Sequence, residues 1–196
     1  MPPEQPIAIV LADINGAGKT TAFQRLLAER LAVMCFVNAD MIARGLNAIA
    51  PETAALQAGR VMLQRLRELR EERADFAFET TLAGKTCLSF LRNLRQDGYV
   101  IELYYFWLDS PELAVERVRT RVASGGHDIP EGTIRQRYGR SLENFWTGYR
   151  HEADSRFDYD NSIFAPVLLA AGHRGDEPLV AQADSWSHFQ KAVDDA

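Results

Sequence analysis

Residues 15–21 read Asn-Gly-Ala-Gly-Lys-Thr-Thr and follow an apolar run over residues 7–12. A buried strand that turns through glycines into a helix opening with Lys-Thr is the pattern of a phosphate-binding loop. Glycines let backbone N–H groups converge on phosphate oxygens, and the helix N-terminus adds a favourable dipole. We predict that Lys19 reaches the outer phosphates of ATP and that the Thr20 hydroxyl binds Mg²⁺. The predicted ATP-binding residues are Asn15, Gly16, Ala17, Gly18, Lys19, Thr20 and Thr21.

One position departs from the full pattern Gly-x-x-x-x-Gly-Lys-Thr, because Asp13 stands where the pattern has glycine. Aspartate tolerates unusual backbone angles better than most residues, so the turn can still form. Its charge matters more: at ~6 Å and an effective dielectric of ~20, each like-charge pair costs roughly 3 kcal/mol before Mg²⁺ screens it. We expect reduced but present ATP affinity, unless the carboxylate points away or holds the metal through water. An alternative function is a nucleotide-binding regulatory or partner-binding protein with impaired catalysis.

Polar side chains also follow the next two expected strands. Asp40 comes after residues 33–38 and is a candidate general base, which would take a proton from a substrate hydroxyl. The alternative is an N-cap for a helix that begins at residue 41. Glu79, Thr80 and Thr81 come at the end of residues 75–79 and are candidates for binding the substrate, with ordinary capping as the alternative.

Arginines gather on two expected helices around a break at residues 125–126. Arg117 and Arg121 lie one turn apart on the first helix. The second helix carries Arg135, Arg137 and Arg140. Because the planar arginine fork grips phosphate oxygens, this arrangement predicts a lid over residues 111–149 that closes on phosphates. The alternative is two solvated helix faces on which glutamates such as Glu116 and Glu143 pair with the arginines.

Strands alternate with helices along the chain, which predicts an α/β fold with a mainly parallel sheet flanked by helices. Ligands then gather at the carboxyl ends of the strands. The predicted strands span residues 7–12, 33–38, 75–79, 99–108, 156–160 and 167–171. The predicted helices span residues 19–31, 52–72, 85–96, 111–123, 133–149 and 186–193. Their expected core positions are Ala55, Leu56, Val61, Leu63, Leu66 and Leu69 on the second, and Ile134, Tyr138, Leu142, Phe145 and Tyr149 on the fifth.

Size and charge narrow the function further. A chain of 196 residues fits a single domain over residues 1–196. The net charge of −5 argues against a nucleic-acid partner. Neither a membrane-spanning run of ~20 apolar residues nor a signal peptide is recognisable, so we expect a cytoplasmic protein. Cys35 and Cys87 are expected to be buried thiols, with a disulfide as the alternative.

Taken together, these pieces resemble the zeta-toxin family of P-loop kinases. The stretches that carry the resemblance include Phe-Glu-Thr-Thr-Leu-Ala-Gly at residues 78–84 and Tyr-Asp-Asn-Ser at residues 159–162. The others are residues 15–21, 38–40 with 42–43, 117–130, and 137–138 with 140–142 and 144. Where the family commonly has Gly-Pro before Asn-Gly, this chain has Asp13 followed by isoleucine.

The resemblance implies a P-loop, nucleotide-kinase-like fold with a helical lid, and a kinase that uses ATP and Mg²⁺. It implies a small-molecule hydroxyl as acceptor, in the family a UDP-linked amino sugar, UDP-N-acetylglucosamine, and a small antitoxin protein as a possible partner. Asp40 matches the family's general base. The remaining matches are Lys19 and Thr20 for ATP and Mg²⁺, Glu79 and Thr81 near the sugar, and Arg121 and Arg137 for the lid.

Overall fold

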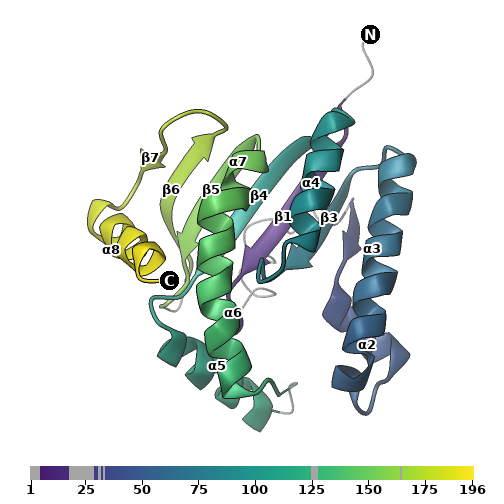
Figure 1. Cartoon of the computed structure of the whole chain (residues 1–196), viewed down its shortest axis with the longest axis horizontal. Coiled ribbons are helices and arrows are strands. Elements are labelled where there is room, and N and C mark those ends of the chain that lie inside the picture. The colour runs from purple at the N-terminus through teal and green to yellow at the C-terminus, as the bar shows by residue number, and fades with distance from the viewer. Residues whose placement is uncertain (1–4, 18–28, 31, 33, 125–127, 164) are drawn as a thin grey trace.

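The strands form one mixed sheet, and the strand that precedes the phosphate-loop sequence lies in its interior. The computed structural model describes residues 5–17, 29–30, 32, 34–124, 128–163 and 165–196. Within these residues the strand order is β2-β3-β1-β4-β5-β6-β7 (Figure 1). From β2 to β5 in this order, each strand is parallel to its neighbour. Strands β6 and β7 each pair antiparallel with the strand before them. The predicted α/β fold with a mainly parallel sheet is confirmed.

The observed elements follow the predicted order closely. The strands are β1 (Ile7–Asp13), β2 (Cys35–Val37), β3 (Phe76–Thr80), β4 (Val100–Trp107), β5 (Ser155–Asp160), β6 (Val167–His173) and β7 (Leu179–Val180). The α-helices are α2 (Ala39–Leu46), α3 (Ala55–Glu71), α4 (Thr86–Gln96), α5 (Pro111–Ala123), α6 (Glu131–Asn144), α7 (Arg150–Glu152) and α8 (Ala183–Asp194). A 3₁₀ turn η1 (Pro51–Ala54) precedes α3, and a π-helical turn η2 (Phe145–Tyr149) follows α6. The helix predicted over residues 19–31 lies mostly outside the described residues.

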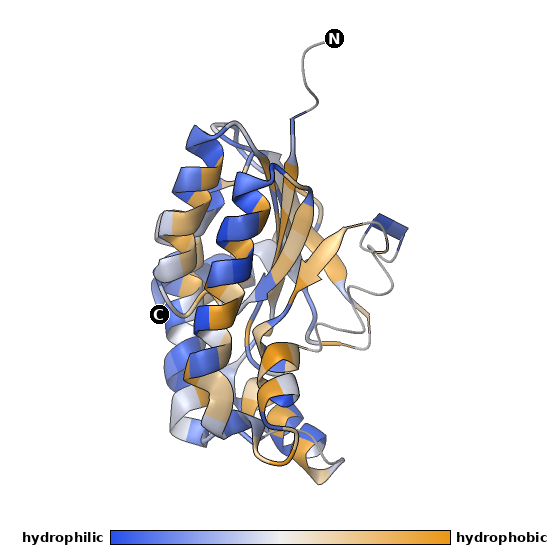
Figure 2. Cartoon of the chain, turned by 90° about the vertical axis from the view of Figure 1, so that its right-hand side faces the viewer, coloured by the Kyte–Doolittle hydropathy of each residue, from blue (hydrophilic) through white to orange (hydrophobic). Residues whose placement is uncertain are grey.

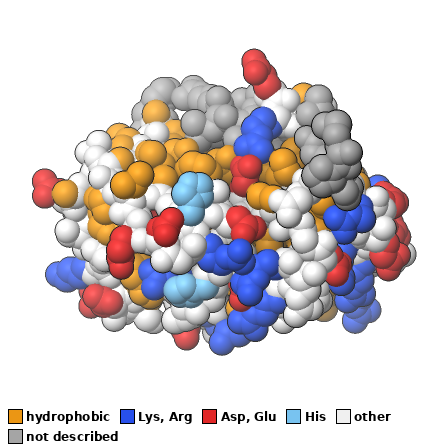
Figure 3. All heavy atoms as spheres, turned by 90° about the horizontal axis from the view of Figure 1, so that it is seen from above, with side chains coloured by type: hydrophobic (Ala, Val, Ile, Leu, Met, Phe, Trp, Pro, Cys, Tyr) orange, Lys and Arg blue, Asp and Glu red, His pale blue; other side chains and the backbone are white. Residues whose placement is uncertain are grey.

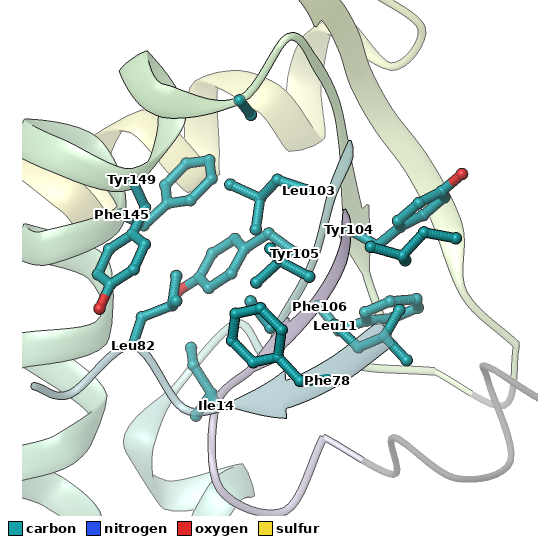
Figure 4. Packing of buried hydrophobic residues seen from close by; sticks show 14 of the residues in the cluster. Leu11, Ile14, Phe78, Leu82, Leu103, Tyr104, Tyr105, Phe106, Phe145 and Tyr149 are labelled. Atoms are coloured by element: carbon teal, nitrogen blue, oxygen red, sulfur yellow. The ribbon is translucent and has the colours of Figure 1, made fainter. Parts of the chain in front are cut away.

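Strand β4 is buried on both faces, which explains its continuous apolar sequence. On one face Tyr105 stacks on Phe145 of η2, with ring centroids 4.2 Å apart and planes 9° apart. On the other face Tyr104 stacks on Phe157 of β5 at 4.8 Å. Figure 4 shows Tyr105 and Tyr104 pointing to opposite sides of the sheet. Such stacked pairs contribute about 0.5–1.5 kcal/mol beyond the area they bury; the first joins the sheet to η2, and the second joins β4 to its neighbour β5.

Helix α3 faces the sheet through a narrower stripe than the sequence suggested. Its buried residues recur at intervals of four and three positions, and they are Ala58, Met62, Leu66 and Leu69. Three of the predicted core positions are wrong: Ala55 is exposed, Leu56 is 85% exposed and Val61 is 40% exposed, while Leu63 is only partly buried. Leu56 and Val61 lie off the buried stripe. Figure 2 shows the hydrophobic sides of the helices turned toward the sheet.

The helix predicted over residues 133–149 is α6 continued by η2. All of its predicted core residues are buried, namely Ile134, Tyr138, Leu142, Phe145 and Tyr149. The π-helical turn brings Gly148 against α4, where an added Cβ would lie 2.8 Å from Cδ2 of Leu88. A side chain at Gly148 would therefore have to displace the end of the Leu88 side chain.

The sequence predicted that both cysteines are buried, and this prediction is wrong. Cys35 is exposed on the edge strand β2, and Cys87 is only partly buried; both are free thiols. Burial raises the pKa of the Cys87 thiol.

Seen from the end where the parallel strands begin, the surface mixes basic and acidic side chains (Figure 3). Within the described part of the chain, no helix is both long enough and apolar enough to cross a membrane.

Candidate nucleotide and acceptor site

The carboxyl ends of the three neighbouring strands β2, β3 and β1 meet at one edge of the sheet. In the parallel register Val37 pairs with Phe78, and Ala12 pairs with Thr80. The residues that follow β1 and β2 therefore come to the same edge as Glu79 and Thr80. The sequence predicted that the candidate site residues gather at the carboxyl ends of parallel strands, and these strand ends are neighbours in the sheet.

The phosphate-loop sequence begins where β1 ends. Asp13 is the last residue of β1, and only 1% of it is exposed. The loop then turns tightly: the Ala17 N–H donates to the Ile14 carbonyl at 2.9 Å. Gly16 has a φ of +90°, and an added Cβ would lie 2.8 Å from the Ala114 carbonyl oxygen of α5. Only glycine meets both demands. Asn15 is buried beside it, whereas Gly18, Lys19, Thr20 and Thr21 lie outside the described residues.

Asp40 lies in the first turn of α2 and is exposed. The cap of this helix is Asn38, whose Oδ1 accepts from the Met41 N–H at 3.0 Å. The N-cap alternative for Asp40 is therefore wrong, because the helix begins at Ala39 and Asn38 already satisfies its first turn. The Asn38 side chain also donates from Nδ2 to Oε2 of Glu79 at 2.6 Å. Through this bond the start of α2 is fixed to the end of β3.

The loop after β3 is held from the side of α6. The Thr80 hydroxyl accepts from the Leu82 N–H at 3.2 Å, while Thr81 is partly buried. Leu82 is fully buried and has a φ of +55°, an unusual conformation for a residue with a branched side chain. Asn144 donates from Nδ2 to the Leu82 carbonyl at 2.7 Å, and the Tyr149 hydroxyl donates to the Gly84 carbonyl at 2.6 Å. These two bonds, the first of them buried, hold the strained turn in place.

The predicted lid helices α5 and α6 contact each other through exposed ion pairs. Arg119 lies 2.7 Å from Glu131, and Arg135 lies 2.5 Å from Glu112. The sequence had suggested Glu116 and Glu143 as partners instead. Arg121, Arg137 and Arg140 have exposed side chains, and residues 125–126 between the helices lie outside the described residues.

Arg117 does not extend outward with the other arginines of α5. Its Nη1 donates to the Asn161 carbonyl at 2.7 Å, and its Nη2 donates to the Ser162 carbonyl at 2.8 Å. Asn161 is 6% exposed and donates from Nδ2 to the Ala17 carbonyl. The segment after β5 therefore packs against the phosphate loop.

Strand β5 carries a buried carboxylate. Asp158 is 1% exposed, and Nε of Arg156 lies 3.2 Å from its Oδ2. The alignment of that contact falls short of a hydrogen bond, and neither carboxylate oxygen accepts one from the described residues. Burial raises the pKa of Asp158 to about 7, although the charges of Arg156 and Arg150 oppose the shift. Among the described residues, no three histidine, cysteine, aspartate or glutamate side chains are grouped as a metal site would need.

The sequence does not predict the contacts by which several residues organise this site. Asn38 is predicted only as the end of a strand, and Arg117 only as a lid arginine. Asn144 has no predicted function of its own, and for Asn161 the sequence favours side-chain capping at a strand end over a metal site. The signal available in the sequence was position: Asn38 and Asn161 each directly follow a strand, where a side-chain amide can bond a neighbouring loop.

The amino-acid sequence was compared with those of known families and proteins. The sequence profile of the family described as Zeta toxin matches residues 1–156. A protein of Haemophilus influenzae described as uncharacterized is 29% identical over 131 residues, which are 67% of this chain and 91% of that protein.

Solved structures give the same fold at low sequence identity. A structure from the PezAT chromosomal toxin–antitoxin system of Streptococcus pneumoniae has a TM-score of 0.62 at 15% identity, over 98% of this chain and 87% of that one. A structure of AvrRxo1-ORF1:-ORF2 with ATP has a TM-score of 0.76 at 15% identity, over 94% of this chain. This chain covers only 63% of that AvrRxo1 chain. At these identities the likeness shows the fold.

Proposed function

Because this chain belongs to the zeta-toxin family, we propose that it is a kinase that transfers the γ-phosphate of ATP to a hydroxyl group of a small molecule. The observation that best supports this proposal is the shared edge of β1, β2 and β3. There the start of the phosphate loop, the first turn of α2 and Glu79 come together. A phosphoryl transfer needs its donor and acceptor sites side by side.

The first part of the proposal is the donor site. The tight turn at Gly16, with its φ of +90°, bends the backbone in the way that a phosphate cradle requires. Lys19 would bind the outer phosphates, and the Thr20 hydroxyl would hold Mg²⁺. The metal, when bound, would neutralise charge on the phosphates. One structure of similar fold was solved with ATP, which supports ATP as the donor here.

The second part is the acceptor site, with Asp40 as general base. The carboxylate of Asp40 is exposed, and the cap of α2 is formed by Asn38. Asp40 is therefore not needed to hold its own helix and can accept the proton of an attacking hydroxyl. Glu79, Thr80 and Thr81 would bind oxygens of the acceptor, for which a UDP-linked amino sugar is the first compound to test.

The third part is the stabilisation of charge during transfer. Arg121 and Arg137 are carried by the two lid helices and have exposed side chains. In the proposed reaction they approach the transferring phosphoryl group and offset its negative charge. The closed lid would also exclude water and so suppress hydrolysis of ATP.

The alternative function is nucleotide binding without efficient catalysis. The observation that favours it is Asp13, an acidic residue buried at the point where the phosphate loop begins. Repulsion from its carboxylate would weaken the binding of triphosphate. In that case the protein would act through a partner; one structure of similar fold named above contains AvrRxo1-ORF1 together with -ORF2.

One experiment separates these functions. The protein is incubated with Mg·ATP and a pool of nucleotide sugars, and mass spectrometry follows any compound that gains one phosphate. A kinase gives such a product; the alternative gives ATP binding by calorimetry without a product. Lys19→Ala and Asp40→Asn should each abolish the product, whereas Glu68→Gln, which removes only a surface ion pair, should leave it unchanged. Full turnover by Asp40→Asn would remove Asp40 from the mechanism.

We also propose a small protein partner that inhibits the kinase, as an antitoxin does. The structural similarity to a toxin–antitoxin system supports this idea. Co-expression with the products of neighbouring genes, followed by size-exclusion chromatography, tests it. A partner should co-elute with this chain and lower its ATP turnover.

A further inference from the structure

The segment after β5 contacts the phosphate loop at Ala17. The Asn161 side chain is 6% exposed and donates from Nδ2 to the Ala17 carbonyl. The backbone of Asn161 is fixed as well, since its N–H donates to the Trp107 carbonyl at the end of β4, at 2.9 Å. The amide that contacts the phosphate loop is therefore anchored to the central strand of the sheet.

Helix α5 holds the same segment from the other direction. The planar fork of Arg117 spans two successive carbonyls, those of Asn161 at 2.7 Å and Ser162 at 2.8 Å. The first half of α5 also contacts the phosphate loop directly, because Gly16 packs on the Ala114 carbonyl. Arg117 and Ala114 lie on neighbouring positions of one helix face. One face of α5 thus supports both the loop and the asparagine that holds it.

Backbone geometry explains why this contact matters for a phosphate. In a trans peptide the carbonyl and the N–H that follows it point in opposite directions. Because Asn161 donates to the Ala17 carbonyl, it also restricts the rotation of that peptide group. Without that donor, the peptide can rotate and present a carbonyl oxygen to an anion, which would repel it.

We propose that Asn161 and Arg117 are positioning residues of the nucleotide site. Asn161 fixes the orientation of the Ala17 peptide, and Arg117 fixes Asn161. The inference rests on the proposed function for its ligand, a nucleoside triphosphate, but neither side chain touches that ligand. Under this proposal, Arg117 is not one of the lid arginines that contact phosphate.

The test compares nucleotide affinity, loop protection and stability. Calorimetry with Mg·ATP and hydrogen exchange measured by mass spectrometry are applied to the wild type, Asn161→Ala, Arg117→Met and Arg117→Lys. Arg119→Gln is the control, since Arg119 lies on the same helix but pairs with the exposed Glu131. Urea denaturation ensures that each variant is measured while folded.

Asn161→Ala should raise the Kd for Mg·ATP about tenfold or more and speed exchange in peptides that cover residues 11–17. Arg117→Met should act in the same direction, and Arg117→Lys, which keeps a donor, should recover part of the affinity. The double variant should bind no more weakly than Asn161→Ala alone, because both changes act through one contact.

Two outcomes overturn the inference. The first is a Kd for Asn161→Ala within about twofold of the wild type; the second is unchanged exchange over residues 11–17. A wild type that binds no nucleotide would instead refute the proposed function, and the exchange result would still decide whether Asn161 and Arg117 order the loop.

Discussion

Replacing Asp158 with asparagine should flatten the pH dependence of the free energy of unfolding. The pKa of this buried carboxyl is raised to about 7 in the folded chain, whereas an unfolded aspartate has a pKa of about 3.9. Between these pH values the folded state binds more protons than the unfolded state. The contribution of Asp158 to stability is therefore present at low pH and is lost as pH rises through 7.

The magnitude follows from the two pKa values. Between pH 5 and pH 8, proton linkage at Asp158 lowers the free energy of unfolding by about 2.5 kcal/mol. The charges that face this carboxyl are Arg156, with Nε 3.2 Å from Oδ2, and the more distant Arg150. Neither prevents the shift, because burial is the larger effect. Asparagine keeps the shape of the side chain but does not titrate.

Urea denaturation of the wild type and Asp158→Asn at pH 5, 6, 7 and 8 measures the effect. The difference in stability between the two proteins should move by about 2.5 kcal/mol in favour of the variant from pH 5 to pH 8. Other titrating groups, such as His151, contribute to both proteins and cancel in this difference. Parallel pH profiles would show that Asp158 does not carry a raised pKa and would refute the reasoning.

Three further substitutions test the backbone in and around the elements that form the site. Gly16→Ala should lower the free energy of unfolding by about 1–3 kcal/mol and abolish ATP binding by calorimetry, because its φ is +90° and its Cβ would clash with the Ala114 carbonyl. Gly45→Ala is the contrasting case: α2 has open space there, so stability in urea should rise by about 0.5–1 kcal/mol. Asn144→Ala should cost about 1–3 kcal/mol in the same measurement, because it leaves the buried Leu82 carbonyl without its donor; a loss below about 0.5 kcal/mol would contradict that role.

Much of the fold could be predicted because local patterns and tertiary packing agree. The buried face of α6 and η2 is an example: Ile134 and Leu142 lie at helical spacing, and both are buried. On α3 the same reasoning was wrong for Ala55, Leu56 and Val61. That helix packs through one narrow stripe containing Ala58, and composition alone cannot reveal which apolar residues lie on it.

The site could be predicted only to the level of which strand ends meet. Strand order brings Glu79 to the edge where β1 ends, as the sequence indicated. The bonds that join the pieces could not be foreseen, because they depend on contacts between distant segments: Asn38 to Glu79, and Asn161 to Ala17. The predicted roles of Lys19 and the other residues of the phosphate loop stay predictions.

The strand order also has a consequence for synthesis on the ribosome. Strand β1 emerges before both of its neighbours, β3 and β4, and the second of these ends at Trp107. A nascent chain shorter than this leaves β1 with an open edge, which is prone to pair with other chains. Chaperones that shield exposed strand edges during translation should therefore engage this protein until β4 has left the exit tunnel.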